Sequence, residues 1–417
     1  MSIKPALGWI QFSREALRQA EATLFSEEQG VRDEIGFLLL HQGYANRFFP
    51  GTSVLQTRLR YILFIPWMYQ RIMKEAHKVS PNELLVREEM RLIERLKKHY
   101  QTAETSDDSS GIIGGRAHAQ KRLTSQPSSM IYWSALGHWG LLRAGPSNVL
   151  PSRNHIHRVL RHRQAHTRLH LDDDGQPLME DSPPFVALPP PPEDWENISA
   201  PLSFALSDDT RDERGFLVRH LASVMRADGE QSLLARMAEN LFDPVSCNFP
   251  WDQKAFQLAD AADRRALERA RQAASLAAIG RAVYAALVEE LREADGQQTE
   301  DIHRSNLKVV MGEHVKAALG LDVPAIVTDC PGIDPQILNI LEQTRSWLER
   351  DENPMALREV YSHAEIRRKG ARARLADTLG GRRRREEWLP EQHAKAYPLE
   401  YRWRNVRRLL MDLRGEG

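Results

Sequence analysis

The sequence predicts a mainly α-helical protein, with a multi-helix N-terminal domain and a helical C-terminal domain joined by an acidic, proline-rich linker. Apolar residues recur at helical spacing through much of residues 13–100 and again at 128–145. Residues 256–294 are rich in alanine, leucine, arginine and glutamate, which favour helices. The apolar stretch at 324–327 is too short to establish a β-sheet.

The 417 residues suit two to three domains of about 150 residues each. We expect residues 1–170 to form the N-terminal domain, with a flexible polar loop at 103–127. Residues 171–205 are predicted to form the linker, because three aspartates lie near their start and they contain runs of proline. Residues 206–417 form the expected C-terminal domain, which ends in a basic segment.

Two helix boundaries are expected inside these domains. Thr52 or Ser53 is predicted to cap a helix that Pro66 kinks or ends, because proline lacks an amide donor. Gly380 and Gly381 are predicted to break the chain before the arginines that follow.

The net charge is zero, with 57 basic and 57 acidic residues, but the charge is unevenly distributed. Residues 1–170 have a net charge of +10, residues 171–300 of −13 and residues 301–417 of +3. This asymmetry indicates either an oppositely charged partner or a solvated acidic stretch between ordinary surfaces.

The two cysteines, Cys247 and Cys330, are far apart and do not form a C-x-x-C pair. This argues against a zinc or iron–sulfur site held by cysteines, and the low cysteine content fits a reducing cytosol. The N-terminus has no apolar signal-peptide core, and the densest apolar stretch, near 61–69, is too short to span a bilayer. We therefore expect a cytoplasmic protein with no membrane partner.

The common catalytic motifs are absent from the sequence, including the P-loop, the dinucleotide-binding glycine motif, H-E-x-x-H and G-x-S-x-G. We therefore assign no catalytic residue, no metal ligand and no cofactor, and consider a non-enzymatic role more probable than an enzymatic one.

Two histidine patterns could instead indicate a metal site or a catalytic site. His155, His157, His162 and His166 include an i, i+4 pair that suits a metal, but the surrounding arginines disfavour a cation. His393, Lys395 and Glu400 resemble one degenerate half of the phospholipase D-type motif, in which histidine attacks phosphorus and lysine binds phosphate. Glutamate replaces the usual aspartate and no second copy exists, so we interpret this match as coincidence.

The basic C-terminus carries the candidate nucleic-acid-binding residues. Residues 364–417 contain 15 basic and 8 acidic residues. Arginine can form paired hydrogen bonds with phosphate oxygens, and a mobile cluster can adapt to a nucleic-acid backbone. The candidates are Arg367, Arg368, Lys369, Arg372, Arg374, Arg382, Arg383, Arg384 and Arg385. An acidic protein surface is the alternative target.

Aromatic residues lie among and after these arginines, at Trp388, Tyr397, Tyr401 and Trp403. They could stack on unpaired bases. We favour instead a core, which would comprise Trp388, Leu389, Trp403, Val406, Leu409 and Leu410. The earlier segment with Gln56, Arg58 and Arg60 has no functional signal by spacing, and one of its arginines is expected to pair internally.

Several stretches resemble an uncharacterised bacterial family of unknown function. They are residues 7–13 (LGWIQFS), 49–58 (FPGTSVLQTR), 61–67 (YILFIPW), 128–136 (SSMIYWSAL), 397–403 (YPLEYRW) and 407–410 (RRLL). Genes of that family often lie beside helicases and phospholipase D-like nucleases in phage-defence islands. The resemblance therefore implies a role in defence against foreign DNA, with the helicase and nuclease of the same operon as partners.

We accordingly expect a non-enzymatic subunit of an anti-phage complex that binds DNA, bridges a helicase and a nuclease, or does both. One alternative is a nuclease with an unrecognised site, such as His393 with Lys395 or the aspartates Asp172–Asp174 holding Mg²⁺. Another is a structural adaptor that makes no DNA contact.

Overall fold

The computed structural model describes residues 34–75, 79–100, 110–145, 148–165, 184–350, 353–393 and 395–416. Within these ranges the chain is mainly helical, and its β-structure consists of two isolated bridges, Leu142 with Phe185 and Met225 with Gln231. The predicted fold class is therefore confirmed. The motif at 7–13, the aspartates Asp172–Asp174, and His166 lie outside the described residues.

The chain divides into two compact units, each built from segments that are distant in sequence. Unit 1 comprises residues 1–44 and 260–401, and unit 2 comprises residues 45–259 and 402–417. The predicted order of domains differs from this division, since it places all of residues 206–417 in one domain. Residues 402–417 belong to unit 2, which the order of segments in the sequence did not predict. There the Trp403 indole donates to the Cys247 carbonyl at 3.1 Å.

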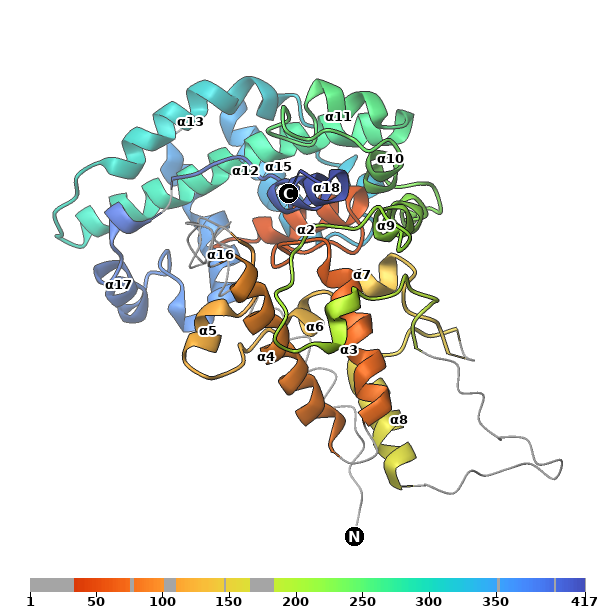
Figure 1. Cartoon of the computed structure of the whole chain (residues 1–417). Coiled ribbons are helices and arrows are strands. Elements are labelled where there is room, and N and C mark those ends of the chain that lie inside the picture. The colour runs from red at the N-terminus through yellow and green to blue at the C-terminus, as the bar shows by residue number, and fades with distance from the viewer. Residues whose placement is uncertain are drawn as a thin grey trace, which may run out of the picture. The chain divides into compact units, whose positions relative to one another are not determined.

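Helix α12 (Ala261–Ala294) is the central helix of unit 1 and is buried on most sides over its middle turns. Asp260 caps its N-terminus by accepting a hydrogen bond from the Asp263 amide at 2.7 Å. Gly280 allows close packing, because a Cβ atom there would lie 2.5 Å from the Phe37 ring. Helix α13 (Ile302–Leu319) packs along α12 (Figure 1).

The start of α13 is capped by a residue of α12. The buried Glu289 carboxylate accepts hydrogen bonds from the amides of Ile302, His303 and Arg304, at 2.9–3.3 Å. These amides have no partner within their own helix, so the carboxylate satisfies them and favours the positive end of the helix dipole. This contact fixes the hairpin between the two longest helices of unit 1.

The rest of unit 1 consists of shorter helices that pack around α12. Its first element, α2 (Phe37–Phe48), crosses into unit 2 after Tyr44. The others are α14 (Ile326–Asp329), α15 (Pro335–Arg350), η2 (Pro354–Leu357), α16 (Arg358–Lys369), η3 (Gly370–Arg372), α17 (Leu379–Glu386) and η4 (Pro390–Gln392). Helix α15 is amphipathic and buries Ile337, Leu341 and Trp347 on one face.

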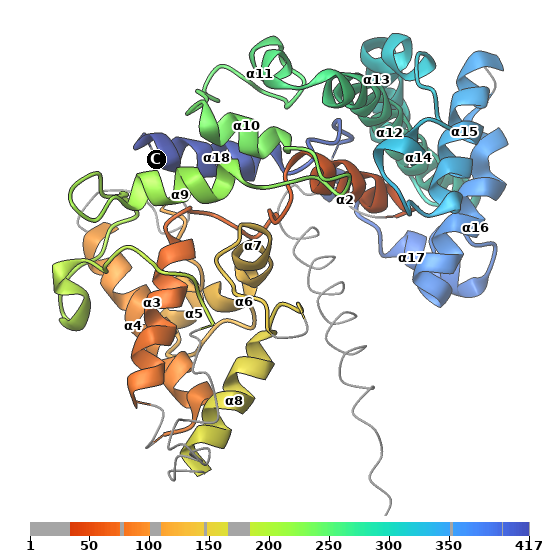
Figure 2. The same cartoon turned by 90° about the vertical axis from the view of Figure 1, so that its right-hand side faces the viewer.

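Unit 2 is built on α3 (Tyr61–Glu75) and α4 (Pro81–Tyr100), which lie side by side in both views (Figures 1 and 2). The predicted cap at Thr52 or Ser53 is wrong, since α3 begins at Tyr61. Pro66 lies within α3, which continues to Glu75. Because Pro66 lies in the second turn, its missing amide removes a single hydrogen bond near the helix start.

The remaining helices of unit 2 surround this pair. They are α5 (Gly115–Ala119), α6 (Ser128–Ile131), α7 (Trp133–His138), α8 (Arg153–Ala165), η1 (Glu193–Glu196), α9 (Glu213–Ala222), α10 (Leu233–Glu239), α11 (Gln253–Leu258) and α18 (Trp403–Arg414). Helix α18 is strongly amphipathic, and its apolar face, which includes Trp403, Val406 and Leu410, is buried.

Residues 184–205, the part of the expected linker that the structure describes, are packed into unit 2. Phe185, Trp195 and Phe204 are buried. The Arg95 guanidinium donates to the carbonyls of Asp194, Trp195 and Ala200 at 2.7–2.9 Å. The arginine thus satisfies backbone carbonyls that this irregular, proline-rich segment cannot pair within itself.

None of the helices in the described ranges is long and apolar enough to cross a membrane.

Candidate nucleic-acid interface

The nine basic residues singled out in the sequence all lie in unit 1, on α16, η3, α17 and the turn between η3 and α17. The predicted break at Gly380 and Gly381 is wrong, because both residues belong to the first turn of α17. The Thr378 hydroxyl caps this helix by accepting from the Gly381 amide at 3.0 Å. A Cβ atom on Gly381 would lie 2.2 Å from the Ala376 carbonyl oxygen, so glycine is required for this close approach.

Three of the nine residues are buried or half-buried and are held by intramolecular contacts. Arg385 is buried and donates to the Asp295 carboxylate at 2.7 Å and to the carbonyls of Arg374 and Ala376. Lys369 and Arg374 both pair with Glu34. We therefore remove Lys369, Arg374 and Arg385 from the candidate set, because reaching a phosphate would require them to leave buried or half-buried partners.

The other six form what we call the arginine surface, and all are exposed to solvent. They are Arg367, Arg368, Arg372, Arg382, Arg383 and Arg384. The side chain of Arg383 is 80% exposed, compared with 51% for Arg382 and 47% for Arg384, and lies 3.3 Å from Glu387. Within the described residues, Arg367 and Arg372 have no ion-pair partner.

The ion pairs of Arg383 and Arg384 are local and accessible, whereas Arg382 also donates to the backbone carbonyl of Asp295 at 2.8 Å, a half-buried residue distant in sequence. Arg384 pairs with Glu387 at 2.7 Å, and Arg382 lies 3.8 Å from Asp295 and 4.0 Å from Glu386. Exposed pairs of this kind contribute about 0–1 kcal/mol each, so a phosphate can replace the carboxylate at little cost. Arg383 and Arg384 therefore present guanidinium groups that a polyanion can reach at little cost.

An exposed leucine accompanies these arginines. Leu379 has 88% of its surface accessible to solvent, although it is a large apolar residue. It lies three and four positions before Arg382 and Arg383 on α17, and this spacing places the three side chains on one helix face. The sequence analysis missed Leu379, because one leucine beside a glycine pair forms no periodic pattern.

The aromatic residues near the C-terminus are mostly core residues, as the preferred interpretation predicted. Trp388 and Tyr401 are buried in unit 1, and Trp403 is buried in unit 2. Leu389 was predicted to be buried with them and is exposed, so that part of the prediction is wrong. Tyr397 is exposed and remains accessible for stacking on a base.

The structure places His393 in a buried aromatic cluster of unit 1. Its ring lies 5.2 Å from the centres of both the His303 and Trp388 rings. Lys395 is exposed and Glu400 is half-buried. A histidine packed between two rings, away from solvent, is poorly placed for attack on a phosphodiester, so none of its described contacts favours the nuclease alternative.

The histidines of α8 have separate roles. His155 is exposed, whereas His157 is buried and its ring bonds to the Tyr69 hydroxyl at 2.8 Å and to the Asn82 side chain. Burial, with the nearby Arg153 and Arg161, lowers the pKa of His157 to about 4. His157 is thus a neutral core residue. Across the described residues, no group of three or more histidine, cysteine or acidic side chains could hold a metal ion.

Arg58 and Arg60, which had no functional signal by spacing, are both buried in ion pairs of unit 2. Arg58 pairs with Asp412 at 2.8 Å and Arg60 with Glu213 at 2.7 Å. The expectation that one of them pairs internally is therefore confirmed for both. The sequence could not identify their partners, because Asp412 and Glu213 are distant in sequence.

Fold and surface together define a mainly helical protein of two compact units, one of which carries an exposed set of arginines. The chain belongs to a family of unknown function, DUF6361, whose model matches residues 4–307. The match covers the motifs at 7–13, 49–67 and 128–136, while the arginine surface and residues 397–410 lie beyond it. Comparison with curated proteins and with solved structures found no match.

Proposed function

We propose that this protein is a non-enzymatic subunit of a bacterial anti-phage complex, and that it binds DNA through the arginine surface. The observation that carries the proposal is the set of six exposed arginines on α16, η3 and α17, of which Arg383 and Arg384 pair with the exposed Glu387. The resemblance to proteins encoded beside helicases and nucleases supplies the biological setting.

Arginine suits this task because its planar guanidinium donates paired hydrogen bonds to phosphate oxygens and remains charged at all physiological pH values. Contacts to phosphates position a protein on DNA without reading its sequence. The proposed binding is therefore independent of base sequence and strongly dependent on salt, since each neutralised phosphate releases condensed counterions.

The direct test measures binding of the full chain to a labelled DNA duplex by fluorescence anisotropy, between about 50 and 200 mM salt. Replacing Arg382, Arg383 and Arg384 together by glutamine is expected to weaken binding by about tenfold or more. The dependence of log affinity on log salt should become less negative by about three, or one unit for each lost phosphate contact.

A matched control removes the same charge from exposed arginines of unit 2, by replacing Arg122, Arg143 and Arg219 with glutamine. This control should bind DNA nearly as tightly as the wild type. Equal losses in both triple variants would mean that net charge alone drives binding, and salt-insensitive binding would exclude phosphate contacts as its source. Either result contradicts the proposal.

Bridging is tested with the tagged chain purified from cells that carry the neighbouring genes. Lysates treated with nuclease are compared with untreated lysates. A helicase or nuclease retained after treatment indicates direct protein bridging, whereas loss of both after treatment indicates that DNA holds the assembly together. Retained partners together with no DNA binding in the anisotropy assay would favour the adaptor without DNA contact.

A further inference from the structure

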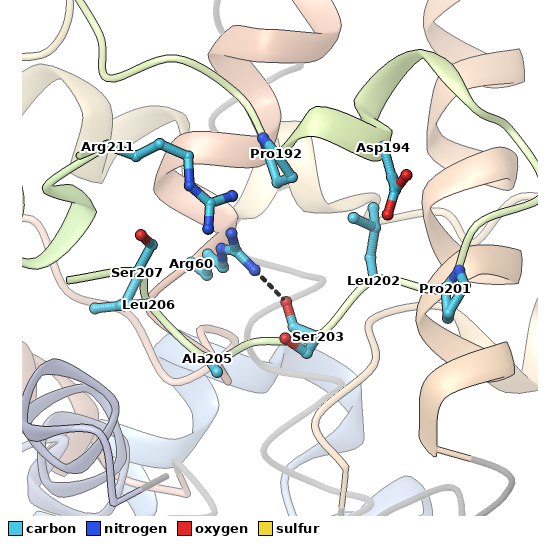
Figure 3. A pocket seen from close by; sticks show the side chains of 10 residues that line it. All are labelled: Arg60, Pro192, Asp194, Pro201, Leu202, Ser203, Ala205, Leu206, Ser207 and Arg211. Carbon is cyan, nitrogen blue, oxygen red and sulfur yellow. Dashed lines mark hydrogen bonds between the residues drawn. The ribbon is translucent and has the colours of Figure 1, made fainter. Parts of the chain in front are cut away.

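Unit 2 contains a pocket of about 310 Å³ that is separate from the arginine surface (Figure 3). It lies between Arg60, which directly precedes α3, and the irregular segment that leads from η1 into α9. Its apolar walls include Pro192, Leu202 and Leu206. A volume near 300 Å³ lies at the lower end of the range for small-molecule sites.

Two arginines face one another in this pocket and share one buried carboxylate. Arg60 donates to Glu213 through Nε at 2.8 Å and through Nη2 at 2.7 Å. The Nη1 atom of Arg211 lies 4.0 Å from the same carboxylate. Figure 3 shows both guanidinium groups pointing toward one another. The Glu213 carboxylate therefore pairs closely with Arg60 and lies near Arg211 on the inner side of the pocket.

Hydrogen-bond donors remain available on both arginines. A guanidinium has five N–H groups. Arg60 uses one each from Nε and Nη2 on Glu213, and one from Nη1 on the Ser203 carbonyl at 2.9 Å. Arg211 uses Nε and Nη2 on Asp209 at 2.9–3.2 Å, and in the described structure its Nη1 donates to no acceptor within hydrogen-bonding distance.

The charge that balances Arg211 comes from an exposed, local partner. The Asp209 side chain is 55% exposed and lies two residues before Arg211 on the same segment. Hydrogen bonds from Arg211 and Ser207 lower the pKa of Asp209 below its usual range. The Asp209 carboxylate thus pairs with Arg211 from the same segment. Because the pair is exposed, another anion can replace Asp209 at little cost.

We propose that this pocket binds a small organic anion, whose carboxylate or phosphate group contacts Arg211 and Arg60 and whose apolar part lies against Pro192, Leu202 and Leu206. The ligand's anionic group takes the place of Asp209 on Arg211 and satisfies the unused donors of both guanidinium groups. The site uses no residue of the arginine surface, so it stands independently of the proposed DNA binding.

Phenyl phosphate and benzoate are the probes, and benzyl alcohol is the uncharged control. Isothermal titration calorimetry on the full chain should show binding of at least one anion and no binding of the alcohol. The better anion identifies the ligand chemistry. Arg211→Gln should weaken its binding by about tenfold or more, because a charge-assisted hydrogen bond is lost. Arg219→Gln, at a more exposed arginine of α9, should bind as the wild type does.

Asp209→Asn provides a test with the opposite sign. Removing the tethered carboxylate should tighten binding of the better anion by about two- to fivefold, because the ligand no longer competes for Arg211. A purely structural role of the Asp209–Arg211 pair predicts no gain. Absence of anion binding by the wild type, equal binding by wild type and Arg211→Gln, or weaker binding by Asp209→Asn would each overturn the proposal.

Discussion

Two sets of arginines, one in each unit, have opposite environments. Those of the arginine surface in unit 1 are exposed, and Arg383 and Arg384 among them pair with the exposed Glu387 nearby at the end of α17. In unit 2, Arg58, Arg60 and Arg95 are buried, and each holds a distant segment through a carboxylate or several carbonyls. Burial and the type of partner, and not the number of arginines, distinguish arginines that are accessible to a ligand from arginines that hold the fold together.

The largest effect is expected at the buried pair of Arg58 and Asp412. Asp412→Ala removes the carboxylate that accepts from the Arg58 guanidinium and from the Leu59 amide at 2.7 Å. Because the Arg58 charge then stays buried without its partner, the free energy of unfolding should fall by about 3–5 kcal/mol. Urea denaturation measures this change.

The control for that experiment is Glu387→Gln, which removes the exposed partner of Arg384. Its cost should stay below about 1 kcal/mol. Similar losses in both variants would erase the energetic distinction between the two sets of arginines.

A smaller effect is expected at Arg95. Arg95→Met keeps the length of the aliphatic stem and removes three hydrogen bonds to the carbonyls of Asp194, Trp195 and Ala200. The expected loss of stability is about 2–4 kcal/mol. Limited proteolysis should also cut within residues 190–203 sooner than in the wild type. Cleavage at unchanged rates would show that aromatic burial alone holds this segment.

Protonation gives a similar contrast on α8, where His157 is buried and His155 is exposed. His157 has its pKa lowered to about 4 by burial, Arg153 and Arg161, from an ordinary value near 6.5. The unfolded chain therefore binds this proton first as the pH falls. Stability from neutral His157 is complete above about pH 6.5 and is lost as the pH falls toward 4, by up to about 3 kcal/mol.

Urea denaturation between pH 7 and pH 4 measures this loss. In His157→Gln the decline in stability over that interval should be smaller, whereas His155→Gln should follow the wild type, because His155 is exposed. An unchanged decline in His157→Gln would assign the acid sensitivity to other groups.

The smallest effect on stability is expected at the arginine surface itself. Replacing Arg382, Arg383 and Arg384 by glutamine should change the free energy of unfolding by less than about 1 kcal/mol, since their pairs are exposed. A loss of several kcal/mol would show that these side chains are structural, and any loss of DNA binding in that variant would then report unfolding. Thermal melting of the same samples used for anisotropy decides between the two.

The C-terminal segment shows how far apolar periodicity can predict burial. The spacing of Trp403, Val406, Leu409 and Leu410 predicted a buried face, and all four are buried. Leu389 broke the pattern: it lies between the end of α17 and the start of η4, where no helical repeat sets the direction of its side chain. Periodicity therefore predicted the core where a helix continued and failed where the helix ended.

The candidate site was predicted in part. Clustering of basic residues in the sequence located six exposed arginines. It could not separate them from Lys369, Arg374 and Arg385, whose partners Glu34 and Asp295 are distant in sequence. The pocket in unit 2 was missed altogether, because Arg60 and Arg211 are distant in sequence and no spacing rule connects them.

The sequence by itself determined the helical class, most of the helices and the positions of strong positive charge, because these follow from local propensity, apolar periodicity and residue type. The tertiary structure alone decided which segments form each unit, which arginines are buried and where a pocket lies. Those features depend on contacts such as Arg58 with Asp412, which join residues more than 350 positions apart. Such pairings satisfy charges that burial would otherwise leave without a partner, and no local pattern in the chain specifies them.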